Sequence, residues 1–225
     1  MNSLKQTTMG AFVPTQQPAA STWATLARRL FLFAIPVATT LVIFRHPPDP
    51  ATATDLGHHT GLYVWIHVGL LFMLPLLGIL IWTLLRGIEN RAASVARALL
   101  PVALVFYAAF DSLVGIVAGL LAHEAMHMSG MASVGAAALA ERWMEIPMPL
   151  PVISTIGVVS WTAVLLATAV AHRQAGSSWV VVGGLALAGP LFGFGHPFIT
   201  GVIGMAGLLA ATVALELGRR SQTTE

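Results

Sequence analysis

The chain has 225 residues, of which 56% are hydrophobic and only 9% charged, and its formal net charge is +2 at pH 7. A soluble domain carries about 25% charged residues, so this composition excludes an ordinary soluble fold and indicates an integral membrane protein. The lack of cysteine excludes disulfides, thiolate metal ligands and iron–sulfur clusters. The basic residues are spread over several loops, and we therefore expect a lipid bilayer as the partner and no nucleic acid.

A helix needs about 20 residues to cross a hydrocarbon core of roughly 30 Å. Six apolar stretches approach or exceed this length, and the first and fifth are the shortest. They are residues 26–45, 62–85, 98–122, 151–171, 178–195 and 197–217. The sequence therefore predicts an all-α, polytopic membrane protein with about six transmembrane helices. Polar cytoplasmic tails at 1–22 and 218–225 would flank a transmembrane domain at 23–217.

The basic residues predict the orientation, because cytoplasmic loops carry an excess of Lys and Arg. Nine of them share one side of the predicted topology: Lys5, Arg28, Arg29, Arg86, Arg91, Arg97, Arg173, Arg219 and Arg220. Only Arg45 and Arg142 fall on the other side. Both termini should be cytoplasmic, in a bacterial inner membrane. Residues 27–32, ARRLFL, also resemble a twin-arginine export signal, but nothing downstream resembles a soluble exported domain, which favours an uncleaved first helix.

Seven of the eight histidines fall on the outer side of this topology. They lie in the first outer loop, about one turn inside the second span, at the end of the third span and in the hairpin between spans five and six: His46, His58, His59, His67, His123, His127 and His196. Imidazole binds copper, zinc and iron, and the thioethers of Met128 and Met131 suit Cu(I). The sequence predicts an outer-face site for copper or zinc, or for non-covalent haem b. The expected core ligands are His123 and His127. The expected further ligands are His67, His196, His58 and His59.

Residues 123–127, HEAMH, give a second interpretation of the same region. On a helix, His123 and His127 lie one turn apart and can bind one ion, while Glu124 is placed to take a proton from metal-bound water. Glu145 on a following helix is the candidate third ligand, and Gly130 would end the first helix. Over these five residues the chain resembles the zinc peptidases, which implies a membrane zinc hydrolase as the alternative function.

The third span carries a stripe of residues at intervals of four, which share one helix face. The stripe consists of Asp111, Gly115, Gly119, His123 and His127. The two glycines allow another helix to approach closely, and they are a candidate surface for other membrane subunits. Asp111 is an ionisable group at membrane depth. It marks either a functional site or a protonated carboxyl bonded to a neighbouring hydroxyl.

Two similar tetrapeptides interrupt the second and fifth spans. PLLG at 75–78 and PLFG at 190–193 occupy corresponding places if spans 1–3 and 4–6 form an inverted 3+3 repeat. The same residues also fit simple helix kinks. A small transporter or a non-catalytic accessory subunit is therefore a third interpretation of the chain.

Overall fold

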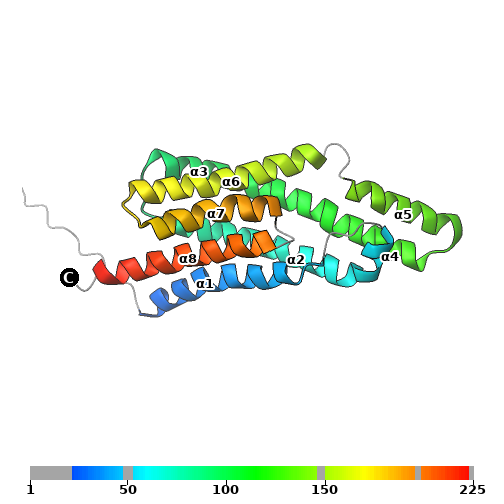
Figure 1. The fold of residues 1–225 in the computed structure, drawn as a ribbon, viewed down its shortest axis with the longest axis horizontal. Helices are drawn as coiled ribbons and strands as arrows, with labels where there is room; N and C mark the ends of the chain where they lie inside the picture. The colour runs from blue at the N-terminus through cyan, green and yellow to red at the C-terminus, as the bar shows by residue number, and fades with distance from the viewer. Residues whose placement is uncertain (1–21, 48–52, 146–149, 196–198, 223–225) are drawn as a thin grey trace, which may run out of the picture.

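The structure, a computed structural model, describes residues 22–47, 53–145, 150–195 and 199–222. The regular elements within these ranges are all helical (Figure 1). They are α1 Thr22–Phe44, α2 Ala53–Leu84, α3 Arg91–Phe110, the π-helical η1 Asp111–Val117, α4 Ala118–His127, α5 Gly130–Met144, α6 Leu150–Gln174, α7 Trp179–Gly195 and α8 Ile199–Gln222. His196 of the predicted site and nearly all of the predicted tail 1–22 lie outside the described residues.

Five of the described helices are long and apolar enough to cross a membrane. They are Trp23–Phe44, Leu56–Leu84, Arg91–His127, Leu150–Gln174 and Ile199–Gly218. The segment predicted as the fifth span, 178–195, forms α7, which is apolar but shorter than the other five. This arrangement supports a helical, polytopic protein whose surroundings are lipid.

Small residues bring the helices of the bundle together. A Cβ at Gly184 of α7 would overlap the carbonyl oxygen of Gly207 on α8, and a Cβ at Gly157 of α6 would meet the backbone of Tyr107 on α3. Close backbone approach of this kind drives helix association where the solvent is itself apolar. Large side chains fill the wider spaces, and Trp161 and Phe192 are fully buried beside Tyr107.

One end of the bundle, which we name the basic end, is where α1 and α3 begin and where α2, α6 and α8 finish (Figure 1). Glu216 of α8 is buried there and accepts contacts from Arg28 at 2.8 Å and Arg29 at 3.4 Å on α1. Arg97 of α3 donates hydrogen bonds to the carbonyls of Leu85 and Ile88, just beyond α2. Charged side chains therefore join the ends of α1 and α8, and the start of α3 to the end of α2, at this level.

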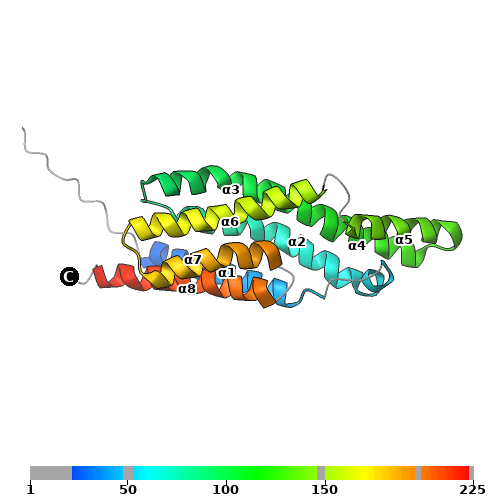
Figure 2. The ribbon, with the colours of Figure 1, turned by 45° about the horizontal axis from the view of Figure 1, so that its top comes forward.

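At the opposite end, the first turns of α2 together with α4 and α5 extend beyond the other helices (Figures 1 and 2). We name this part the projecting end. The helix α2 begins at Ala53, so the prediction that His58 and His59 lie in a loop is wrong. His67 is likewise about four turns inside α2, and not one. The added turns form because Leu56 and Tyr63 bury against small residues of α4 and α5 in a separate apolar cluster.

Candidate functional site

The histidine pair of HEAMH lies on a helix, as predicted. His123 and His127 are exposed near the end of α4, with ring centroids 4.2 Å apart. The Nδ1 atom of His127 lies 2.8 Å from the carbonyl oxygen of His123. Because a carbonyl only accepts hydrogen bonds, this Nδ1 carries the hydrogen, and the Nε2 of the neutral ring keeps its lone pair. Backbone hydrogen bonding to one ring nitrogen is how proteins orient the other nitrogen toward a metal.

The turn that follows the pair places methionine sulfur nearby in sequence. The helix α4 ends as the N–H of Met128 donates to the carbonyl of Glu124, and Gly130 takes the left-handed conformation at φ +62° that starts α5. Glu124 and Met128 are exposed, and Met131 is 91% exposed. An open hollow at this turn is lined by Met128, Ser129, Gly130, Met131, Ser133, Val134 and Gly135.

The structure does not bring Glu145 to the histidine pair. Ser133 of α5 donates a 2.7 Å hydrogen bond to the carbonyl of Ala125 on α4, which sets the antiparallel register of the two helices. That register places Glu145 level with about Leu113, roughly 21 Å from the level of His127 at about 1.5 Å per residue. The Glu145 carboxylate instead accepts a 3.1 Å contact from Arg142, and both side chains are exposed. The spacing of 18 residues suggested a helix return but could not show which end of α5 meets the pair.

The other predicted ligands also lie apart from His123 and His127. His58 and His59 are exposed on α2, and the ring of His67 lies against Gly115, about 12 Å below the level of His123. Among the residues that the structure describes, no group of three or more His, Asp or Glu side chains is arranged to hold a metal ion. The two histidines of HEAMH are therefore an exposed pair, and metal binding by them stays a prediction.

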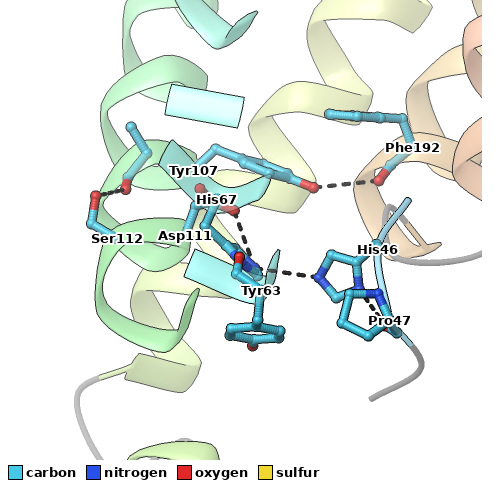
Figure 3. A network of polar contacts seen from close by, with 9 residues as sticks. His46, Pro47, Tyr63, His67, Tyr107, Asp111, Ser112 and Phe192 are labelled. Carbon is cyan, nitrogen blue, oxygen red and sulfur yellow. Dashed lines mark hydrogen bonds and ion pairs between the residues drawn. The ribbon is translucent and has the colours of Figure 1, made fainter. Parts of the chain in front are cut away.

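The structure does assemble a second polar group, which the sequence did not predict as a unit (Figure 3). His46 Nε2, just beyond α1, lies 3.5 Å from His67 Nε2, and His67 Nε2 lies 3.9 Å from Asp111 Oδ1. His67 is 4% exposed and Asp111 is 2% exposed. We refer to His46, His67 and Asp111 as the buried cluster. Nothing in the spacing of positions 46, 67 and 111 indicates that they meet.

The helix geometry explains how the buried cluster forms. Asp111 begins the π-helical segment η1, and Gly115 in the same segment leaves room for the ring of His67. The Nδ1 atom of His67 donates a 2.8 Å hydrogen bond to the carbonyl of Tyr63, one turn earlier on α2. Neither oxygen of Asp111 has a hydrogen-bond partner among the described residues. An interrupted helix and a buried polar side chain coincide here, and π segments are frequent at functional sites.

The predicted glycine surface is occupied by a helix of the same chain. A Cβ at Gly115 would overlap the His67 ring, and a Cβ at Gly119 would meet Val64 and Tyr63 of α2. The expectation that these glycines receive another subunit is therefore corrected: α2 already covers them. The stripe at intervals of four is buried at Asp111, Gly115 and Gly119, whereas its last two members face solvent.

The fold and its sites define a class, and comparison with known proteins adds nothing narrower. Long apolar helices and a polar cluster buried among them define a polytopic helical protein suited to a bilayer. No family model, no curated protein and no solved structure matches the chain. Its function must be inferred from the chemistry of its own residues.

Proposed function

We propose that this protein is a bacterial inner-membrane protein that binds a transition-metal ion, copper or zinc, at its projecting end. Its role would be metal handling or an accessory part in redox chemistry. The observation that supports this most directly is the exposed pair His123 and His127, one helical turn apart, with the Nδ1–H of His127 held by a backbone carbonyl. Two imidazoles at this spacing form a chelate with a single ion.

The open character of the pair fits transfer of an ion better than permanent retention. Structural zinc sites are closed by four protein ligands, whereas an incomplete set leaves positions for a second ligand or an incoming group. Met128 and Met131 flank the same turn, and their soft thioethers favour Cu(I). The zinc-hydrolase alternative has less support, because Glu145 lies roughly 21 Å from the level of His127.

We further propose six spans, with α7 as the shortest, and both termini in the cytoplasm. The basic end of the bundle carries Arg28, Arg29, Arg86, Arg91, Arg97 and Arg173, whereas Arg45 and Arg142 lie toward the projecting end. Such an asymmetry fits a cytoplasmic basic end and an outer projecting end. Pro75 within α2 and Pro190 within α7 keep the inverted 3+3 repeat as part of this proposal.

Metal binding by the untagged protein tests the proposal. We would purify the chain in a mild detergent, measure bound metals by mass spectrometry, record the visible spectrum, and titrate with Cu(I), Cu(II) and Zn²⁺. The double variant His123→Ala/His127→Ala should lose at least about tenfold in affinity. His172→Gln at the basic end is the control, and its affinity should match that of the wild-type chain.

Each outcome decides between named alternatives. A Soret band that disappears in the double variant would identify haem b as the occupant in place of a bare ion. Neither metal nor haem after reconstitution, or equal affinities in the wild-type chain and the double variant, would overturn the proposal. The chain would then fit the accessory or transporter interpretation.

A further inference from the structure

We propose that His46, His67 and Asp111 form a proton relay between the outer aqueous side and a carboxyl group buried in the bundle. The cluster lies where the projecting end joins the other helices, about 12 Å below the level of His123. It shares no residue with the exposed pair. The proposal therefore stands whether or not the projecting end binds a metal.

The ring tautomers are set by backbone carbonyls. His46 Nδ1 lies 2.6 Å from the carbonyl oxygen of Pro47, and His67 Nδ1 lies 2.8 Å from that of Tyr63. Carbonyl oxygens only accept, so each Nδ1 carries a hydrogen and each neutral ring keeps its lone pair on Nε2. These two Nε2 atoms face each other at 3.5 Å. Two lone pairs repel at this distance, whereas one proton between them forms an N–H···N hydrogen bond.

Asp111 supplies the proton that this contact requires. Its Oδ1 lies 3.9 Å from His67 Nε2, and neither of its oxygens has a hydrogen-bond partner among the described residues. An ionised carboxylate without a partner is costly at this depth. At rest the proton is therefore either on Asp111, which leaves both groups neutral, or on His67, which makes an ion pair; the state without it is a transient one. Both arrangements keep the local charge at zero.

The three side chains are in series, with His67 between the other two (Figure 3). In the outward direction Asp111 Oδ1 and His67 Nε2, 3.9 Å apart at rest, first close to hydrogen-bond distance; the O–H bond of Asp111 then breaks and an N–H bond forms at His67 Nε2. That proton then moves to His46 Nε2, and His67 becomes neutral again. His46 is partly exposed at the end of α1 and releases the proton to water. Uptake follows the same steps in reverse, so Asp111 regains its proton from the outer side.

The groups around the cluster hold it in place, and none of the contacts described below lies between His46, His67 and Asp111. Tyr63 of α2 packs against both imidazoles, with ring centroids 5.4 Å from His46 and 4.3 Å from His67. The hydroxyl of Tyr107 on α3 donates to the carbonyl of Phe192 on α7 at 3.4 Å. Two polar residues adjoin the cluster in sequence: Ser112 follows Asp111 and donates to the carbonyl of Ala108, and the exposed Arg45 precedes His46.

A shared metal ion is the competing occupant of the buried cluster. The donor atoms of the cluster lie 3.5 Å and 3.9 Å apart (Figure 3), somewhat more than the roughly 3.3 Å between two ligand atoms of one tetrahedral zinc ion, so the test must distinguish a metal from a proton. The cluster is not among the arrangements that could hold a metal in the described part of the chain. A stoichiometric metal ion that His46→Gln removes would overturn the relay.

Infrared spectroscopy of the full-length protein in liposomes tests the relay directly. The carboxylic C=O band of Asp111 is identified by its loss in Asp111→Asn. In the wild-type chain this band should change over the same pH range as the imidazole bands, because coupled groups titrate together. In His67→Gln that common change should disappear, whereas His172→Gln should behave as the wild-type chain does. An Asp111 band that titrates identically in the wild-type chain and His67→Gln overturns the proposal.

The path through His46 has a separate measurement. On transfer to D₂O, the Asp111 band of the wild-type chain should shift, and in His46→Gln the exchange should slow about a hundredfold. His46 lies at the edge of the bundle, so this variant keeps the core intact. Exchange at the wild-type rate in His46→Gln, or no exchange at all in the wild-type chain, overturns the relay. Metal titration of His67→Gln should match the wild-type chain, which separates failure of the relay from failure of the metal site.

Discussion

The imidazole of His67 occupies the space that a side chain at position 115 would need. A Cβ at Gly115 would overlap the Cδ2 and Cγ atoms of His67 and would lie 2.7 Å from Nε2. A side chain at position 115 would push the His67 ring away from Asp111. The ring cannot move freely, because its Nδ1 donates a hydrogen bond to the carbonyl of Tyr63. The absence of a side chain at Gly115 thus allows the geometry of the buried cluster.

We expect Gly115→Ala to destabilise the protein. Overpacking costs about 1–3 kcal/mol, and the better helix propensity of Ala recovers at most about 1 kcal/mol of that. Thermal unfolding in detergent would measure the change. The matched control is Gly135→Ala on α5, where a Cβ would meet no atom within 4 Å. That control should be neutral or slightly stabilising, and equal effects of the two substitutions would contradict the packing of His67 on Gly115.

The carboxylate of Glu216 should matter for stability at the basic end. Its side chain is 5% exposed and bridges Arg28 and Arg29, so Glu216→Gln removes the negative charge that two guanidinium groups share. We expect a loss of about 2 kcal/mol in the free energy of unfolding, less than for a fully buried pair, because both arginines are partly exposed. Chemical denaturation in mixed micelles would report it.

An exposed ion pair in the same chain provides the comparison. Arg142 and Glu145 are each 66% exposed, so Glu145→Gln should change the unfolding free energy by less than about 0.5 kcal/mol. If this variant lost as much stability as Glu216→Gln, burial would not be what distinguishes the two pairs.

The proposed orientation can be read from two single-cysteine variants, because the wild-type chain has none. Ser94 lies exposed near the start of α3 at the basic end, and Ser129 lies exposed at the tip of the projecting end. In cells with a permeabilised outer membrane, a membrane-impermeant maleimide should label Ser129→Cys. It should reach Ser94→Cys only after the inner membrane is opened. The reverse pattern would place the basic end outside.

Glu124 separates binding from hydrolysis. Its side chain is exposed beside the histidine pair, and it is not a metal ligand in the proposed site. We expect Glu124→Gln to keep copper or zinc affinity within about threefold of the wild-type value, since the imidazoles provide the chelate. Peptide hydrolysis by the wild-type chain that Glu124→Gln abolishes would instead establish the zinc-hydrolase alternative.

Hydropathy was sufficient to predict most of the helices. The stretch 62–85 appeared as a span because nearly every residue in it is apolar, and the structure continues the same helix back to Ala53. The additional turns contain His58 and His59, and because polar residues lower the local hydropathy, hydropathy alone predicts a loop there. Those turns are nevertheless helical, since Leu56 is buried against alanines of α4 and α5.

The buried cluster could not be predicted from spacing. The sequence drew attention to His67 and Asp111 separately, each as an ionisable residue near or within a span. Their meeting depends on the register between α2 and η1, which Gly115 sets, and on where α1 ends relative to both. The π-helical turns at 111–117 add to the difficulty, because no residue pattern marks a shift from i+4 to i+5 hydrogen bonds.

The continuous helical segment from Arg91 to His127, which includes the π turns of η1, has 37 residues, about 55 Å at the rise of an α-helix, against a hydrocarbon core of roughly 30 Å. Asp111, His123 and His127 therefore lie on one continuous helical segment, and the wider π turns of η1 lie between the carboxyl and the two histidines. Tightening those π turns to α-helical ones would rotate the upper part of the segment by about 100°, the angle of a single residue. The direction in which His123 and His127 face thus depends on whether the turns beside Asp111 are π-helical or α-helical.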